Sequence, residues 1–221
     1  MAEKILMSEY RALAKEPWTN IELVHENIME WNVALIPVNK ESTYYGGYFM
    51  SKMTFPKDYP FSPPTFRFTR PLTHPNVYPD GRLCISILHP PGEDTMSGEL
   101  ASERWSAAQR VESVLISILS LLDDPEVSSP ANVDAGVLFR KDPDSFKAAV
   151  KKDIDISKKD IPADFKMPTE QSAYKKEEEA YNFSWSDSEV EDDFGSESDA
   201  EMGFDDEDED EQMEEASDES E

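Results

Sequence analysis

A thiol and an amide lie eight residues apart near the middle of this chain. Cys84 is the only cysteine, and Asn76 precedes it in the run His74-Pro75-Asn76. A thiol can form a covalent thioester with an acyl group, and a nearby amide can stabilise the oxyanion that forms when the thioester is attacked. The alternative for a lone cysteine is a buried packing residue. The elements around Cys84 therefore carry the evidence that separates a nucleophile from a packing thiol.

The elements before Cys84 are predicted to be one helix and four strands. Residues 3–15 have their apolar side chains on one helical face, and Pro17 marks the end of that helix. The proline-rich run over residues 59–64 favours a stiff extended connection. Gly46-Gly47 is typical of a bulge or a close approach within a strand. The strands, rich in branched and aromatic residues, are predicted at 21–26, 31–38, 44–55 and 65–68.

The elements after the fourth strand are predicted to be an irregular segment and then helices. Residues 71–92 contain five prolines and fit no regular element. From Val111, apolar residues recur at helical spacing until Pro125 ends the helix. Two further helices are predicted at 132–140 and 144–156. This order indicates an α+β fold, with a four-stranded antiparallel meander sheet and helices packed on one side.

Charge divides the chain into two parts. The 221 residues have a formal net charge of −27, but residues 177–221 hold 23 acids and no Lys, Arg or His. We expect a folded domain over residues 1–168, with its core at about 3–156, and a disordered acidic tail over 169–221, which is too poor in branched aliphatics to fold alone. One cysteine and three histidines exclude a Cys/His zinc cluster, so no metal site is expected. Without an apolar run of about 18 residues we expect no membrane partner, and we expect no nucleic-acid partner.

The ordered motifs of the chain resemble those of the ubiquitin-conjugating enzymes. These motifs are Tyr59-Pro60-Phe61-Ser62-Pro63-Pro64, then His74-Pro75-Asn76, then Cys84, then Trp105 ahead of an amphipathic helix. The resemblance implies the fold of that family and a Cys84 thioester with ubiquitin, which a lysine amine then attacks. It implies that Asn76 stabilises the oxyanion or shapes the active-site loop, and that His74 is a structural imidazole rather than a general base. No cofactor is expected, because the activating enzyme uses the ATP.

Two departures from the family pattern concern the carboxylates near the cysteine. Many relatives carry acids where this chain has Ser86 and, in Ser128-Ser129-Pro130, serines that include Ser129. Relative to the family, this chain also has an insertion at about 91–104, between Cys84 and Trp105. We expect this acidic loop to orient or deprotonate the incoming lysine, although a solvated surface loop is the alternative. The acids of the loop are Glu93, Asp94, Glu99 and Glu103.

The resemblance also assigns two contact surfaces. Glu112, Ile116 and Ser120 share the exposed face of the helix from Val111, where relatives hold the donor ubiquitin; a single exposed isoleucine would otherwise need no explanation. Ligase docking is matched by position to Phe61, Ser106 and Ala107. A buried core position is the alternative for Phe61.

The acidic loop and acidic tail together resemble one subgroup of the family, which serves cullin–RING ligases in cell-cycle protein turnover. The resemblance implies proteasome-targeting ubiquitin chains and a location in cytoplasm and nucleus. A flexible polyanion can steer its carrier to a basic partner surface. Five serines are each followed three residues later by an acid, a pattern that suggests tail phosphorylation. Aromatic residues between the acids suggest that the tail binds shallow apolar pockets of a partner. These are Ser184, Ser186, Ser188, Ser196 and Ser198, and Tyr181, Phe183, Trp185, Phe194 and Phe204.

Two other classes of function stay open on the sequence. One is a catalytically silent adaptor that handles ubiquitin, although inactive members of such a family usually lack the cysteine. The other is an acidic chaperone or nucleic-acid mimic that acts through its tail. Removal of residues 177–221 would spare thioester formation by an enzyme and abolish the function of a tail-driven chaperone.

Overall fold

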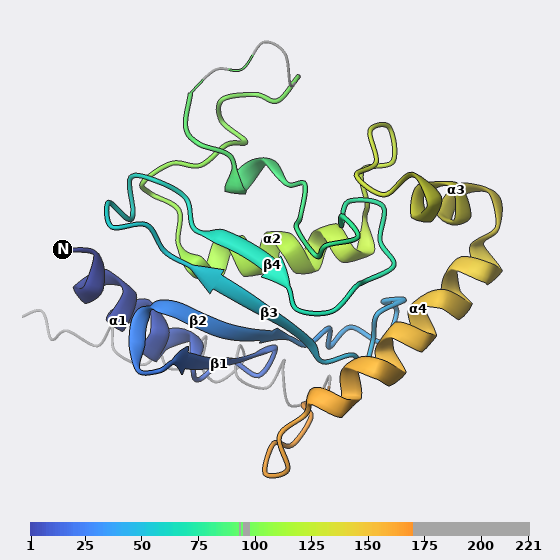
Figure 1. Ribbon diagram of the computed structural model, residues 1–221, viewed down its shortest axis with the longest axis horizontal. Helices are drawn as coiled ribbons and strands as arrows, with labels where there is room; N and C mark the ends of the chain where they lie inside the picture. The colour runs from blue at the N-terminus through green and yellow to red at the C-terminus, as the bar shows by residue number, and fades with distance from the viewer. Residues whose placement is uncertain (93, 95–97, 170–221) are drawn as a thin grey trace, which may run out of the picture.

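The computed structural model describes residues 1–92, 94 and 98–169, and Figure 1 shows how their elements are arranged. An N-terminal helix leads into a four-stranded sheet, an irregular segment follows, and the remaining helices come last. This order confirms the α+β fold predicted from the sequence. The predicted acidic tail, with its aromatic residues and serines, lies outside the described residues apart from Thr169.

The sheet is an antiparallel meander whose strands follow one another in chain order. At its centre Trp31 pairs with Leu23 on one side and with Met53 on the other. Every second residue of β2 from Trp31 onward faces the core, so Trp31, Val33 and Leu35 are all buried there. Strand bounds are β1 Thr19–Val24, β2 Asn27–Leu35, β3 Phe49–Thr54 and β4 Thr65–Phe68.

The third strand begins later than the sequence predicted. Residues 44–48 were expected to be strand, but they lie in turns and an irregular connection, and β3 begins at Phe49. Gly46 has a φ of 78°, which L-residues rarely adopt, so it supports a turn rather than a bulge. A Cβ on Gly47 would lie 2.3 Å from the Phe49 ring, so this glycine does permit a close approach. The aromatic residues of this segment therefore pack without extending the ladder.

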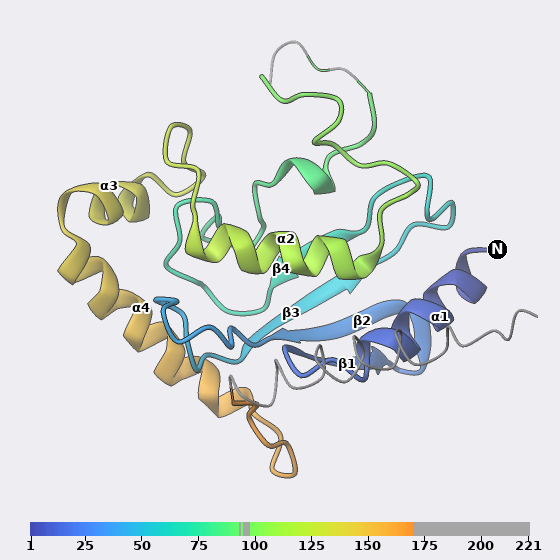
Figure 2. The same ribbon diagram turned by 180° about the vertical axis from the view of Figure 1, so that it is seen from behind.

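Two helices cover one face of the sheet and a third runs past its end (Figure 2). Helices α1 (Ala2–Leu13) and α2 (Val111–Asp123) contribute buried aliphatic side chains to the same core as β2. Helices α3 (Val133–Lys141) and α4 (Pro143–Ser157) follow, each begun by a side-chain cap, from Asn132 and Asp142. Within the described part of the chain, no helix is long and apolar enough to cross a membrane.

The segment after α4 folds back onto the opposite face of the sheet. A short 3-10 helix, η2 (Lys158–Asp160), leads into Ile161, Phe165 and Met167, which pack on Ala34, Ile36 and Tyr48. The Tyr48 and Phe165 rings meet edge to face with centroids 5.4 Å apart. Packing thus continues past residue 156, and Met167 belongs to the folded part of the protein.

Candidate active site

Cys84 lies at the edge of an open cleft of about 730 Å³. Its half-buried thiol belongs to the irregular segment after β4, just before the short 3-10 helix η1 (Ser86–Leu88). The cleft brings together the cysteine segment, the acidic loop, the C-terminal half of α2 and the loop that follows α2. The lining residues that the sequence predicted are Asn76, Cys84, Ser86, Glu99, Glu103 and Ser129, and those it did not are Ile85, Ile87, Gly98, Ser117, Leu121, Glu126 and Ser128.

His74 anchors the segment that leads to the thiol. It is fully buried (0% exposed), and its Nδ1 accepts a hydrogen bond from the Asn76 backbone N–H at 3.0 Å. Nε2 therefore carries the proton and donates it to the Leu121 carbonyl at 2.9 Å. Burial lowers the pKa of His74 to about 4, so the imidazole is neutral at neutral pH. With both nitrogens engaged, the geometry favours a structural role over general-base catalysis.

Asn76 connects the cysteine segment to the loop after α2. Its backbone carbonyl accepts the Cys84 N–H at 2.9 Å, and its side-chain Nδ2 donates to the Glu126 carbonyl at 2.8 Å. These two bonds are compatible with the loop-shaping alternative for Asn76. A side-chain amide has two N–H groups, so the bond to Glu126 uses only one of the two donors on Nδ2. Among the described residues, the buried Oδ1 has no hydrogen-bond partner, and only 2% of Asn76 is exposed.

The surroundings of the Cys84 thiol favour its protonated form. Burial raises the pKa of Cys84, and the negative charge of Glu99 raises it further. A hydrogen bond with the Tyr78 side chain acts in the opposite direction. The Arg82 guanidinium lies over the Tyr78 ring, 5.2 Å from its centroid. Tyr78 therefore favours the thiolate form of Cys84, a role that no sequence spacing pointed to.

The described part of the acidic loop is held by ion pairs and hydrogen bonds. His89 Nδ1 lies 2.8 Å from one carboxylate oxygen of Glu99 and 2.9 Å from the other. Arg104 donates to the Pro90 carbonyl at 2.9 Å and lies 3.4 Å from Asp94. These contacts place Glu99 beside the thiol, where it lines the cleft with Glu103. Asp94 does not line the cleft, and Glu93 lies outside the described residues.

Glu126 is a further carboxylate of the cleft, and the sequence analysis missed it. The Ser128 backbone N–H donates to Glu126 Oε1 at 2.7 Å, and the Ser128 side chain also binds this carboxylate. Both hydrogen bonds lower the pKa of Glu126. The serine pair at 128–129 had suggested that no acid remained at this end of the site. The only available signal was an acid directly after Pro125, which ends the helix. Across residues 1–92, 94 and 98–169, no acidic or histidine cluster is arranged to hold a metal.

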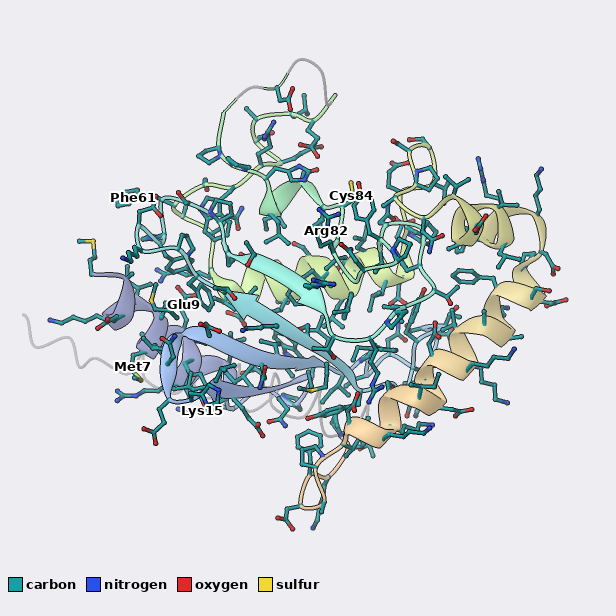
Figure 3. The ribbon with its side chains drawn as sticks, in the orientation of Figure 1. Met7, Glu9, Lys15, Phe61, Arg82 and Cys84 are labelled. Atoms are coloured by element: carbon teal, nitrogen blue, oxygen red, sulfur yellow. The ribbon has the colours of Figure 1, made fainter. Side chains whose placement is uncertain are left out.

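The residues of the predicted contact surfaces are exposed. Phe61 is 64% exposed, which contradicts the alternative of a core position. Pro60 and Trp105 are joined by a 2.8 Å hydrogen bond from the indole N–H, so the loops bearing Phe61 and Ser106-Ala107 are neighbours. Figure 3 shows Phe61 and Cys84 well apart along the molecule. On α2 the exposed residues include the three predicted ones, Glu112, Ile116 and Ser120.

Comparison with known proteins gives one family. Residues 5–154 match the family model of ubiquitin-conjugating enzymes. The chain is 49% identical over 207 residues to "Ubiquitin-conjugating enzyme E2-34 kDa" of Saccharomyces cerevisiae, which covers 87% of this chain and 70% of that protein. It is 50% identical over 149 residues to "Ubiquitin-conjugating enzyme E2 13" of Arabidopsis thaliana, and 47% identical over 148 residues to "Ubiquitin-conjugating enzyme E2 G2" of Homo sapiens. Each of these two alignments covers 66% of this chain and 89% of the relative.

The matched region contains the whole sheet, the cysteine segment and α2. It therefore contains every element that forms the cleft around Cys84. The predicted resemblance is confirmed, as is the prediction that the protein is an enzyme of the thioester-forming kind. From its sequence match and its site, this chain belongs to the ubiquitin-conjugating enzyme family.

Proposed function

We propose that Cys84 carries ubiquitin as a thioester and that the cleft around it is where a lysine amine attacks. The observation that supports this most directly is chemical. Members of the family work through a thioester, and Cys84 is the only cysteine in the sequence. Its thiol lies at the edge of a cleft lined by an amide and by three carboxylates, from Glu99, Glu103 and Glu126.

The proposed reaction consists of two acyl transfers. In the first, the Cys84 sulfur attacks the thioester carbonyl of ubiquitin on the activating enzyme, and the thiol of that enzyme leaves. In the second, a lysine nitrogen attacks the Cys84 thioester, an isopeptide bond forms, and the Cys84 thiolate leaves and takes up a proton. The attacking amine must lose two protons in all, one to become neutral and one after attack. Cleft carboxylates are the acceptors that this site offers, since both nitrogens of His74 are engaged.

Asn76 has two contributions in this proposal. The bond from Nδ2 to the Glu126 carbonyl keeps the loop after α2 against the cysteine segment. The remaining N–H of the amide stabilises the oxyanion that forms at the thioester carbon, an effect worth about 2.7–4 kcal/mol for such donors. Ser86 and Ser129 line the same cleft and provide hydroxyl groups near the incoming amine.

We further propose that the protein builds proteasome-targeting ubiquitin chains with a cullin–RING ligase. Ubiquitin, the activating enzyme and a ligase are partners of the family as a whole. Support for a ligase with a basic surface comes from the 23 acids of residues 177–221. The alignment with the yeast relative extends over 87% of this chain, compared with 66% for the two others. Phe61, Ser106 and Ala107 form the proposed RING contact, and Ile116 the centre of the donor-ubiquitin contact.

Three narrower expectations also remain proposals. The enzyme needs no cofactor of its own, because ATP is consumed by the activating enzyme. It works in cytoplasm and nucleus. Phosphorylation of the tail serines would add roughly −1.5 to −2 charge per site and strengthen the attraction to a basic partner.

The thioester is tested by incubating the full-length protein with ubiquitin, activating enzyme and ATP, followed by a non-reducing gel. We expect a ubiquitin-sized adduct that thiol removes and that Cys84→Ala lacks. Cys84→Ser is the matched variant, because its oxyester should form and resist thiol. Deletion of residues 177–221 should leave the adduct intact while reducing the salt-sensitive stimulation by a cullin–RING core. A folded wild-type protein that forms no adduct would favour the silent adaptor. Loss of all activity when residues 177–221 are deleted would favour the acidic chaperone.

A further inference from the structure

Glu9 is a buried carboxylate that joins three separate parts of the fold. It lies on α1 and is only 8% exposed. The Tyr59 hydroxyl is 3.0 and 3.1 Å from its two carboxylate oxygens, and the Val111 backbone N–H donates to Oε2 at 2.7 Å. The Arg110 guanidinium lies 3.7 Å from Oε1. The bond to Val111 spans 102 positions in the sequence.

The partners of Glu9 belong to the segments that carry the proposed ligase contacts. Tyr59 lies two residues before the exposed Phe61, and the Tyr59 and Trp105 rings have centroids 5.9 Å apart. Ser106 and Ala107 follow Trp105 directly. Figure 3 shows Glu9 at the same end of the molecule as Phe61, with Cys84 farther along. A ligase that binds these loops therefore contacts segments that include Tyr59, which binds Glu9, and Trp105, which packs on Tyr59.

Helix α2 extends from Glu9 to the cysteine segment. Val111 is its first residue, so Glu9 binds one of the free N–H groups at the helix start. The helix has 13 residues and is therefore about 20 Å long. Near its other end, the Leu121 carbonyl accepts the His74 N–H. From His74, hydrogen bonds continue through Asn76 to the backbone N–H of Cys84. One rigid element thus has a ligase-side anchor and a thiol-side anchor.

A buried carboxylate at this position is hard to explain by stability alone. Removing a carboxylate from water costs several kcal/mol, and well-packed apolar groups of similar volume often stabilise a protein as well or better. What a carboxylate adds is directional bonding to a phenol and a helix start at once. Burial and the nearby Glu9 charge raise the pKa of Tyr59, so the phenol stays protonated and remains a donor.

We propose that Glu9 is a positioning residue that couples ligase docking on the Phe61 and Ser106-Ala107 loops to α2, and through α2 to the Cys84 segment. The inference rests on the proposed thioester function. In this coupling, ligase binding shifts the Tyr59 loop. The shift changes the hydrogen bonding of Glu9 to the start of α2, and α2 then moves as a unit against His74. Glu9 itself touches neither ubiquitin nor the reacting atoms.

The test compares Glu9→Gln and Tyr59→Phe with wild type in single-turnover discharge of the Cys84 thioester to free lysine, with and without a cullin–RING core. Gln keeps the shape but replaces one acceptor oxygen with an N–H₂ group that faces donors, and Phe removes only the hydroxyl. Glu22→Gln, at an exposed strand position, is the matched control. The affinity of the core is measured separately by titration.

We expect both variants to load ubiquitin and to bind the core with unchanged Kd. At saturating core we expect the discharge rate to fall by about threefold to tenfold, while the discharge rate without the core changes little. The proposal is overturned by an equal fall with and without the core, by a weaker Kd at unchanged saturated rate, or by no change. If Glu9→Gln does not fold, the discharge rates of Tyr59→Phe with and without the core test the proposal by the same outcomes. A wild type that forms no thioester would instead refute the proposed function.

Discussion

The two ends of α2 are built in opposite ways. At its start, the buried Glu9 carboxylate receives donors from Tyr59 and Val111 and lies near Arg110. Near its end, the Leu121 carbonyl accepts the His74 N–H, and Leu121 lines the open cleft that holds the half-buried thiol of Cys84. A docking end needs fixed geometry, so its polar groups are satisfied internally. A reacting end needs polar groups that substrate can use, and carboxylate-bearing residues, Glu99, Glu103 and Glu126, line the cleft there.

The largest effect is expected at the reacting end, from Asn76→Ala. Loss of the oxyanion donor should slow lysine discharge by about a hundredfold or more, while ubiquitin loading on Cys84 remains. Single-turnover discharge on pre-loaded enzyme measures this, with Asn132→Ala, a cap of α3, as the control for loss of an Asn nearby. If loading and discharge fall together, Asn76 acts only through the bond to the Glu126 carbonyl.

At the docking end, Phe61→Ala should weaken ligase binding without altering the thiol end. An exposed aromatic anchor is worth 2 kcal/mol or more in a hot spot, so the affinity for a RING ligase should weaken by about thirtyfold. Isothermal titration of the ligase core against wild type and variant measures the change. Basal thioester formation is the internal control, and a variant that keeps its ligase affinity would remove Phe61 from the docking surface.

Between the two ends, His74 should make stability depend on pH. Its native pKa is about 4 and its ordinary value 6.5, so the unfolded chain takes up a proton first as the pH falls. His74 therefore costs stability progressively from about pH 6.5 down to pH 4, by up to about 3 kcal/mol. Chemical denaturation of wild type and His74→Gln should show a stability advantage of the wild type that narrows over this window. A constant difference would contradict the burial argument; His25→Asn, which removes an exposed imidazole, is the control.

The smallest effect is expected from Glu99→Gln in the acidic loop. The Glu99 charge is the second cause, after burial, of the raised pKa of Cys84. Removing this charge lowers that pKa, so the pH profile of Cys84 alkylation should move to lower pH by a modest amount. Glu103→Gln is the matched control, since Glu103 lines the same cleft without contributing to that shift. Movement to higher pH would show that the carboxylate assists the thiolate.

Much of the fold was predictable because its signals are local. The helical periodicity from Val111 and the strand patterns around Trp31 gave elements of the right type in the right order. The start of the third strand was wrong, because the aromatic residues at 44–48 have high strand propensity yet pack in turns. Gly46 at positive φ and the 2.5 Å bond from Ser42 to Asp123 hold that segment off the sheet.

The site was predictable only in part, for a related reason. Cys84, Asn76 and His74 lie within eleven consecutive residues, so one short motif identified them together. Glu126 reaches the cleft, and Tyr78 reaches the Cys84 thiol, by way of loop geometry that no spacing encodes. The insertion showed its acids in the sequence, but contacts with His89 and Arg104 decide that Glu99 faces the thiol while Asp94 does not line the cleft.

The sequence by itself determined the nucleophile, since there is one thiol, and the separation of a near-neutral domain from an acidic tail. It also determined the order of the elements, because residue type and periodicity act over a few neighbours. Only the tertiary structure decided which carboxylates share the cleft and which one is buried at the start of α2. Those outcomes depend on pairs such as Glu9 and Val111, 102 residues apart, whose burial and bonding exist only once the chain has folded.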